Sequence, residues 1–182
     1  MNMRPSVRDA MLADVPNLRA FAISLCGNVD RANDLVQETL LRATANIDSF
    51  QPGTNMSAWL FRILRNLFRS EYRRRRREIE DTDGGYAASL ASLPEQHSRV
   101  EFEEFRVALA ELPQEQREAL ILVGASGFSY EEAAAICDCP VGTLKSRVNR
   151  ARTRLSVLLS IETADDFGPD RPTKAALSGG RG

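Results

Sequence analysis

The chain has 182 residues, of which 43% are hydrophobic and 27% charged, with three cysteines and a net charge of −1. This length fits one ordinary domain or two small ones, and the cysteines are too few for a disulfide framework, which favours a reducing compartment. The start of the chain has no apolar secretion signal and no apolar run is long enough to cross a bilayer. We therefore expect a cytoplasmic protein with no membrane partner.

The near-neutral net charge hides three segments of strong local charge. Residues 58–77 contain eight arginines and one glutamate, a local charge of +7, and residues 141–155 contain five bases and no acid. Residues 78–98 contain five acids and no lysine or arginine. Separate basic patches balanced by an acidic stretch are typical of a nucleic-acid-binding protein that also has to stay soluble.

The first 77 residues carry three stretches in which apolar residues recur at spacings of three and four, which predicts amphipathic helices. Candidate N-caps are Asp14, Asp30 and Ser57. No stretch of useful length alternates apolar and polar residues as a strand would, so we expect an all-α fold with a first helical bundle at residues 1–77. The expected inward residues are Leu18, Phe21, Ala22 and Leu25, then Leu35, Thr39, Leu40 and Ala43, then Trp59, Leu60, Ile63, Leu64, Leu67 and Phe68.

Within the second of these stretches, residues 34–39 read Asp-Leu-Val-Gln-Glu-Thr. This pattern places Asp34, Gln37 and Glu38 on neighbouring turns of one helix. Such a polar face is either simply solvated or a docking surface for a basic partner.

Residues 59–72 interleave aromatic residues with arginines. Aromatic rings can stack on exposed bases while guanidinium groups bind phosphates, a combination that suits separated DNA strands. However, Trp59, Phe61 and Phe68 at helical spacing are more often core residues than a stacking platform. The arginines at 73–77 could likewise be a solvated helix end.

From residue 78 to 98 the periodicity dissolves into acidic and small residues, which predicts a flexible acidic linker. A second bundle is expected at residues 99–160, followed by a disordered tail at 161–182. Within this bundle Pro113 opens one helix, and Ser129 with Glu132 has the spacing of a capping box.

A tight turn at residues 137–140 then separates a short helix from a basic one at 141–155. This order is typical of a helix-turn-helix that reads the major groove. The inward stripe of the basic helix is Leu144, Val148, Ala151 and Leu155, and its outward face carries Thr143, Lys145, Ser146, Arg147, Asn149 and Arg150. Arginine and lysine can pair with guanine, and asparagine with adenine.

Catalysis and cofactor binding are not expected. The single histidine, His97, falls in the predicted linker, and no further Cys or His lies at metal-ligand spacing from Cys137 and Cys139. No glycine-rich phosphate loop is present. We therefore predict no catalytic residue, no metal site and no cofactor. A stand-alone helix-turn-helix regulator is the alternative, and it would explain the second bundle but not the first.

Together, these segments resemble the extracytoplasmic-function (ECF) sigma factors of bacterial RNA polymerase. Residues 34–39 resemble region 2.2 of that family, residues 59–66 with Tyr72 and the arginine run resemble regions 2.3 and 2.4, and residues 139–147 resemble the recognition helix of region 4.2. A narrower resemblance, to the EcfG group of general-stress sigma factors, rests on residues 65–73, 116–123 and 127–134.

The resemblance implies promoter-specific transcription initiation and a set of partners. Asp34, Leu35, Gln37 and Glu38 would bind the β′ clamp helices of core polymerase, and the β flap would be a further contact of core polymerase. The −10 element would be melted and read by Trp59, Arg62, Asn66, Phe68, Arg69, Tyr72 and Arg73. The −35 element would be read by Thr143, Lys145, Ser146, Arg147, Asn149 and Arg150.

The EcfG resemblance also implies control by a NepR-type anti-sigma factor, itself captured by a PhyR-type response regulator. Two tethered bundles with apolar grooves could be bridged by an inhibitor helix. The sequence leaves open whether the bundles lie apart or together.

Overall fold

A computed structural model describes residues 5–80 and 99–159 of the chain, which form α-helices and one short 3-10 helix, with no strand among them. The all-α prediction is confirmed. The predicted tail at 161–182 and nearly all of the predicted linker lie outside the described residues. The helices are α1 (Pro5–Ala13), α2 (Val15–Cys26), α3 (Val29–Ala45), η1 (Ile47–Ser49), α4 (Met56–Glu80), α5 (Arg99–Ala110), α6 (Gln114–Gly124), α7 (Tyr130–Cys137) and α8 (Val141–Leu158).

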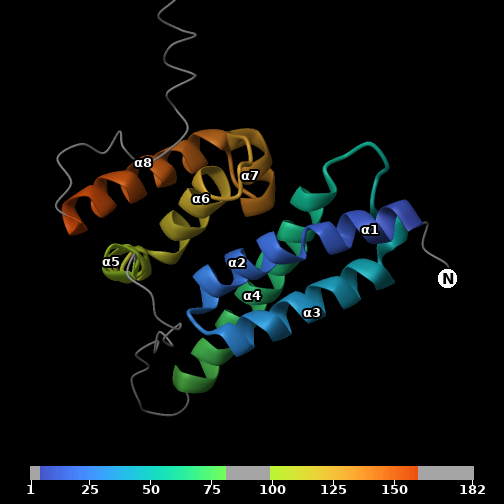
Figure 1. Cartoon of the computed structure of the whole chain (residues 1–182), viewed down its shortest axis with the longest axis horizontal. Helices are drawn as coiled ribbons and strands as arrows, with labels where there is room; N and C mark the ends of the chain where they lie inside the picture. The colour runs from blue at the N-terminus through green and yellow to red at the C-terminus, as the bar shows by residue number, and fades with distance from the viewer. Residues whose placement is uncertain (1–4, 81–98, 160–182) are drawn as a thin grey trace, which may run out of the picture.

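The first bundle consists of α1 to α4, in which α2 and α3 pack side by side against the long helix α4 (Figure 1). The predicted inward stripes of α2, α3 and α4 are buried, apart from Leu40, Trp59 and Ile63, which are half-buried. Phe21 of α2 stacks on Phe61 of α4 with ring centroids 5.1 Å apart. Burial of these stripes is what holds the amphipathic helices together.

The helix starts differ from the prediction at α3 and α4, and Asp14, at the predicted N-cap position of α2, forms no side-chain capping hydrogen bond. Asn28, not Asp30, is the N-cap of α3: its backbone is extended and its side chain accepts a hydrogen bond from the backbone nitrogen of Arg31 at 2.9 Å. Asp30 lies in the first turn, where a carboxylate is favourable to the helix dipole. Likewise Asn55, not Ser57, accepts a bond from the backbone nitrogen of Ala58 at the start of α4. Helix α4 also continues to Glu80, beyond the predicted boundary at residue 77.

Helices α5 to α8 form the second bundle. The predicted capping box at the start of α7 is present: Ser129 accepts from the backbone nitrogen of Glu132, and the Glu132 side chain accepts from the backbone nitrogen of Ser129. The predicted inward stripe of α8 is fully buried. These features confirm the helix-turn-helix prediction.

The turn between α7 and α8 contains Asp138 in the left-handed region, at φ 50° and ψ 54°. Among the described residues, Asp138 is the only non-glycine residue whose φ is positive. Aspartate tolerates this conformation better than most side chains do. The residue therefore ends α7 sharply and sets the direction in which α8 leaves the turn.

Asp138→Val is expected to lower the free energy of unfolding by about 1–2 kcal/mol, because a β-branched side chain is strained in the left-handed region. Asp138→Gly removes the steric penalty and should leave the protein at least as stable as the wild type. Urea denaturation midpoints measure both effects. Equal midpoints for the two variants would contradict the role assigned to this backbone conformation.

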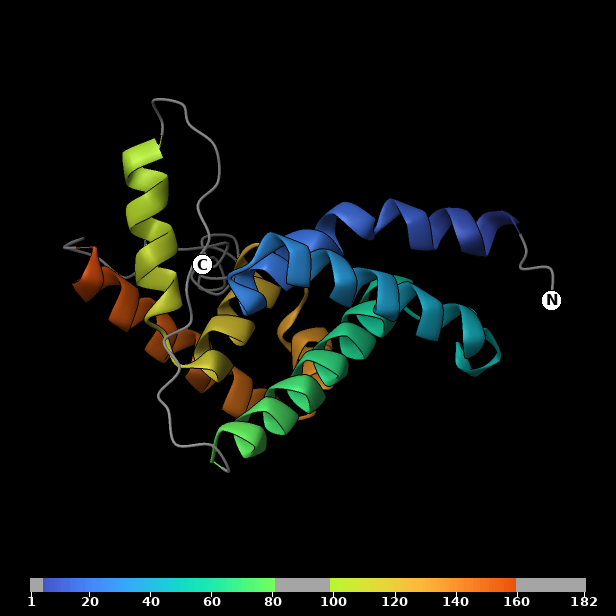
Figure 2. The ribbon, with the colours of Figure 1, turned by 90° about the horizontal axis from the view of Figure 1, so that it is seen from below.

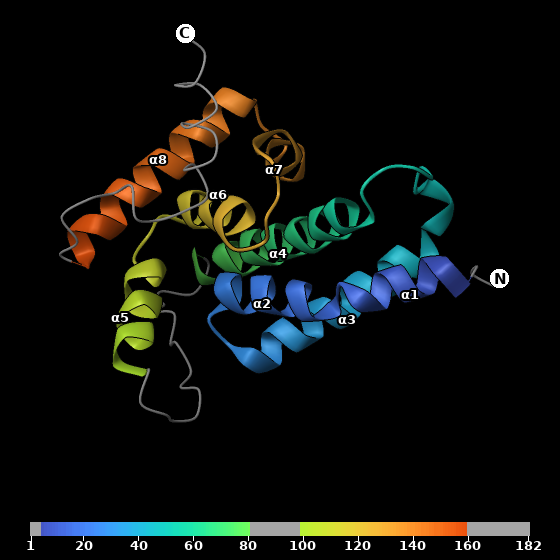
Figure 3. The ribbon, with the colours of Figure 1, turned by 45° about the horizontal axis from the view of Figure 1, so that its top comes forward.

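The two bundles lie against each other in the structure. Helix α7 packs on α4, and α6 packs on α2 as well as on α7 and α8 of its own bundle (Figures 2 and 3). Phe128, just before α7, meets the edge of Phe61 in α4 with centroids 4.9 Å apart. Helix α4 is therefore shared between the core of the first bundle and the interface with the second. No helix in the described part of the chain is both long and apolar enough to cross a membrane.

Candidate nucleic-acid interface

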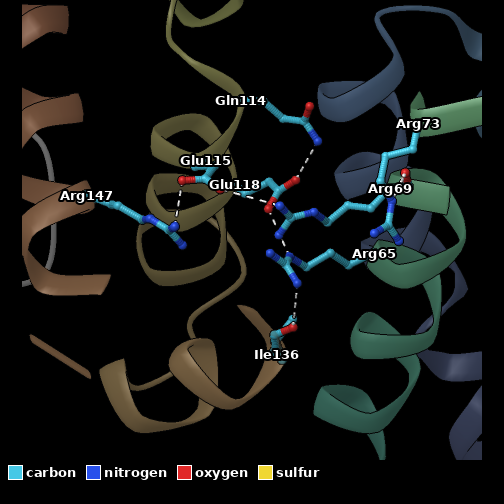
Figure 4. Close-up of polar contacts among 8 residues, drawn as sticks. All are labelled: Arg65, Arg69, Arg73, Gln114, Glu115, Glu118, Ile136 and Arg147. Carbon is cyan, nitrogen blue, oxygen red and sulfur yellow. Dashed lines mark hydrogen bonds and ion pairs between the residues drawn. The ribbon is translucent and has the colours of Figure 1, made fainter. Parts of the chain in front are cut away.

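A polar stripe runs along α4. Arg62, Asn66, Arg69 and Arg73 recur at spacings of four, three and four, so they share one face of the helix over about 16 Å. All are exposed except Arg69, which is 37% exposed at its side chain. The Nε of Arg73 donates to the carbonyl of Arg69 at 3.3 Å, which aligns the two side chains (Figure 4). This stripe can follow a nucleic-acid backbone.

The aromatic residues of α4 divide between the core and the surface. Phe61 and Phe68 are buried, and the Arg31 guanidinium lies over the Phe68 ring at 5.7 Å. Trp59 is half-buried against Phe50, whereas Tyr72 is 48% exposed. In this arrangement Phe68 is a core residue, and a base could stack on Tyr72 without any rearrangement of the core.

The predicted docking face of α3 is also divided. Asp34 and Gln37 are exposed, and Glu38 forms an exposed ion pair with Arg42 at 2.8 Å. Leu35 is buried and packs in the hydrophobic core beneath this face. The sequence reasoning missed Leu41, which is 66% exposed on the same side of the helix as Gln37 and Glu38. The sequence does contain a signal for this residue, because Leu41 is apolar but lies outside the inward stripe of the helix.

The outward face of α8 lies beside the start of α6. Thr143, Ser146, Arg147 and Arg150 line a surface hollow together with residues 113–116. Arg147 forms an ion pair with Glu115 at 2.6 Å, and its side chain is only 20% exposed. Lys145 lies 5.5 Å from the ring of Tyr130, and Asn149 is exposed. Thus Asn149 and Arg150 lie open to a partner, while Arg147 and Lys145 already have protein contacts.

Two acids of α6 were missing from the predicted site. Glu115 contacts both Arg69 and Arg147, and Glu118 forms a buried ion pair with Arg65 (Figure 4). A sequence signal existed for Glu118, because it begins an otherwise apolar run that ends at Val123. A charged side chain next to such a run is seldom buried unless an opposite charge pairs with it.

The three cysteines are free, with Cys137 buried and Cys26 and Cys139 half-buried. Burial raises the pKa of Cys137 to about 12 and that of Cys26 to about 11, so both thiols are protonated at neutral pH. Among the described residues no three His, Cys, Asp or Glu side chains are grouped as metal ligands. The cysteines serve as small packing residues in this fold.

Comparison with known proteins agrees with this geometry. Residues 12–78 match the family model for Sigma-70 region 2, and residues 102–155 match that for Sigma-70 region 4. The chain is 70% identical over 179 residues to the ECF RNA polymerase sigma factor EcfG of Rhodopseudomonas palustris strain TIE-1, covering 98% of this chain and 99% of the relative.

Solved structures show the same fold. The sigma factor RpoE of Bartonella quintana, crystallised with the anti-sigma factor NepR, is 52% identical, with a TM-score of 0.82 over 88% of this chain and 100% of RpoE. The NMR structure of the PhyRSL–NepR complex from Sphingomonas sp. Fr1 shares 20% identity and a TM-score of 0.64 over 85% of this chain and 90% of the matched chain, a likeness of fold alone.

The basic face of α4 and that of α8 thus each fall inside a matched sigma region. A stand-alone helix-turn-helix regulator would account for the second region but not for the first. The chain belongs to the ECF sigma factors of RNA polymerase and resembles the EcfG relative along nearly its whole length.

Proposed function

We propose that this sigma factor uses its two bundles to grip one promoter at two places, while α3 docks the first bundle on core polymerase. The observation that carries the proposal is the pair of exposed polar and basic faces on α4 and α8, each on a different bundle. Phosphate contacts fix the position of a protein on DNA, whereas contacts to base edges select sequence. Two such faces on separate bundles suit the two separated elements of a promoter.

Residues 1–77 form the unit that binds core polymerase and melts the −10 element, in this proposal. Asp34, Gln37 and Glu38, with Leu41, contact the β′ clamp helices. Asn66 lines a pocket for an extruded base, and Arg62, Arg69 and Arg73 bind the flanking phosphates. Trp59 and Tyr72 border this site. Phe68 joins it only if its ring leaves the core.

Residues 99–160 form the unit that reads the −35 element and contacts the β flap, joined to the first unit by the linker at 78–98. Lys145, Ser146, Asn149 and Arg150 face base edges in the major groove. Thr143 and Arg147 lie nearer the DNA backbone. The protein acts in the cytoplasm, where core polymerase is.

A NepR-type anti-sigma factor controls this activity, and a PhyR-type response regulator captures that anti-sigma factor, which links the sigma factor to general stress genes. The high similarity to RpoE supports this part of the proposal, because that protein was crystallised with NepR. Run-off transcription with purified core polymerase on a promoter library tests the whole scheme. Transcription from a defined promoter class, silenced when NepR is added, is the expected result, and failure to bind core polymerase would overturn it.

Arg150→Ala is expected to weaken selection of the −35 element by about 1–3 kcal/mol, because the exposed guanidinium can form a bidentate pair with guanine. The measurement is a competition assay in which DNA with the selected −35 sequence and DNA with a scrambled one compete for binding to the holoenzyme. Arg154→Ala, one turn further along α8 and also exposed, is the matched control. An equal loss on both DNAs would assign Arg150 to the phosphate backbone.

A further inference from the structure

The interface between the two bundles contains a buried ion pair. Nε of Arg65 in α4 lies 2.9 Å from Oε2 of Glu118 in α6, with side chains only 2% and 1% exposed. Arg65 also donates from Nη1 to the Ile136 carbonyl at the end of α7, at 3.3 Å. The second oxygen of Glu118 accepts from Nε2 of Gln114 at 2.9 Å. One arginine of the first bundle is thus bound by two helices of the second (Figure 4).

This ion pair makes the contact between the bundles easier to reverse than an apolar one. Burying two charges costs hydration free energy, and their attraction repays it only when their hydrogen bonds are complete. Here Nη2 of Arg65 is buried and has no hydrogen-bond partner among the described residues. When the bundles separate, both charges recover their hydration. Matched apolar side chains at the two positions would hold the interface more firmly.

Glu115, one turn before Glu118, connects the same interface to both candidate DNA-binding faces. Its Oε1 lies 3.4 Å from Nη2 of Arg69 in α4, and its Oε2 lies 2.6 Å from Nη2 of Arg147 in α8. Its carboxylate therefore occupies one arginine from each face, as a phosphate group would. Closure of the bundles and binding of DNA compete for these two guanidinium groups.

We propose that Arg65, Glu118 and Glu115 form an intramolecular ionic latch that holds the free sigma factor closed and keeps Arg69 and Arg147 from DNA. The latch sets what fraction of the free protein is open, and the affinity of the protein for DNA falls with that fraction. The DNA part of this inference rests on the proposed promoter-contacting roles of α4 and α8. The closure of the two bundles does not depend on those roles, because it rests on the contacts between α4, α6 and α7.

Glu118→Gln and Glu131→Gln form a matched pair, because each removes one negative charge from the second bundle and Glu131 is exposed on α7. Glu118→Gln leaves Arg65 facing an uncharged partner, so the bundles should separate. Small-angle X-ray scattering of the full chain should give a larger radius of gyration for Glu118→Gln only. Its affinity for a random-sequence 30-base-pair duplex at low salt should exceed that of Glu131→Gln by about tenfold.

Glu115→Gln provides a variant that does not disturb a buried group, since its side chain is 49% exposed. It should tighten binding to the same duplex, with a log–log salt dependence steeper by about one to two, because two guanidinium groups become available to phosphates. Circular dichroism confirms that each variant keeps its helices. If Glu118→Gln fails to fold, Glu115→Gln still decides whether the two arginines are withheld from DNA.

The double variant Arg65→Met with Glu118→Met keeps the net charge and fills the interface with apolar groups. It should stay compact, bind the duplex more weakly than the wild type and give less run-off transcript. The latch is overturned if the double variant opens as Glu118→Gln does, or if Glu118→Gln matches Glu131→Gln in both scattering and DNA binding. Opening without any gain in DNA binding would instead contradict the proposed promoter contacts while supporting closure.

Discussion

Phe61→Ala is expected to lower the free energy of unfolding by about 3–5 kcal/mol, the range seen when a buried phenylalanine is truncated. Phe61 is 0% exposed, stacks on Phe21 and meets the edge of Phe128. The alanine variant removes the apolar area, leaves a cavity and breaks both ring contacts. Chemical denaturation followed by circular dichroism measures the loss. A loss below about 1 kcal/mol would mean that the site is not packed as described.

The same residue tests whether the bundles are in contact in solution. Phe61→Leu keeps most of the apolar volume but loses both ring contacts, so it should cost less than Phe61→Ala. A double-mutant cycle with Phe128→Ala should show a coupling of about 0.5–1.5 kcal/mol, because the two rings meet across the interface. Additive effects of the two alanine variants would indicate that the bundles are apart.

Asp34→Arg is expected to weaken core-polymerase binding by about 2–5 kcal/mol, the cost of opposing like charges in a desolvated contact. This corresponds to a loss of roughly 30-fold to several thousand-fold in affinity. Asp34 is exposed in the middle of α3, on the face proposed to dock on a basic coiled coil. The affinity can be measured by fluorescence anisotropy of labelled sigma factor titrated with core polymerase.

Asp48→Arg is the control for that experiment, because it makes the same change of charge at an exposed position of η1, away from the proposed docking face. It should bind core polymerase within about threefold of the wild type, because a charge outside the contact acts only through screened long-range electrostatics. If both variants lose affinity equally, long-range electrostatics rather than a specific contact would be responsible. If neither does, α3 is not the docking face.

The periodic stretches were sufficient to predict the helices and most of the core. Leu18 and Leu25 in α2, and Leu144 and Leu155 in α8, are buried as their spacing indicated. This works because an amphipathic helix has one way to remove its apolar stripe from water, whatever it packs against. The capping box at Ser129 was predictable for a similar reason, since both of its hydrogen bonds form within four residues.

Details that depend on competition between neighbours were not predictable. Asn28 and Asp30 are both good N-cap residues, and the backbone conformation after Gly27 decided between them. The position of Phe68 was left open by its spacing, and the packing of α3 against α4 with Arg31 over the ring placed it in the core. The predicted DNA-binding faces were recognised from charge, whereas their protein partners on α6 were not.

By itself the sequence determined two helical bundles, their inward stripes and the basic faces that identify a sigma factor, because these follow from periodicity and charge within single helices. Only the tertiary structure decided that the bundles meet, that Arg65 and Glu118 are buried together, and that Glu115 lies between the two basic faces. Arg65 and Glu118 are 53 residues apart in the chain. The apolar run after Glu118 is a local signal for its burial, but nothing local indicates Arg65 as its partner until α4 and α6 come together and exclude water from both.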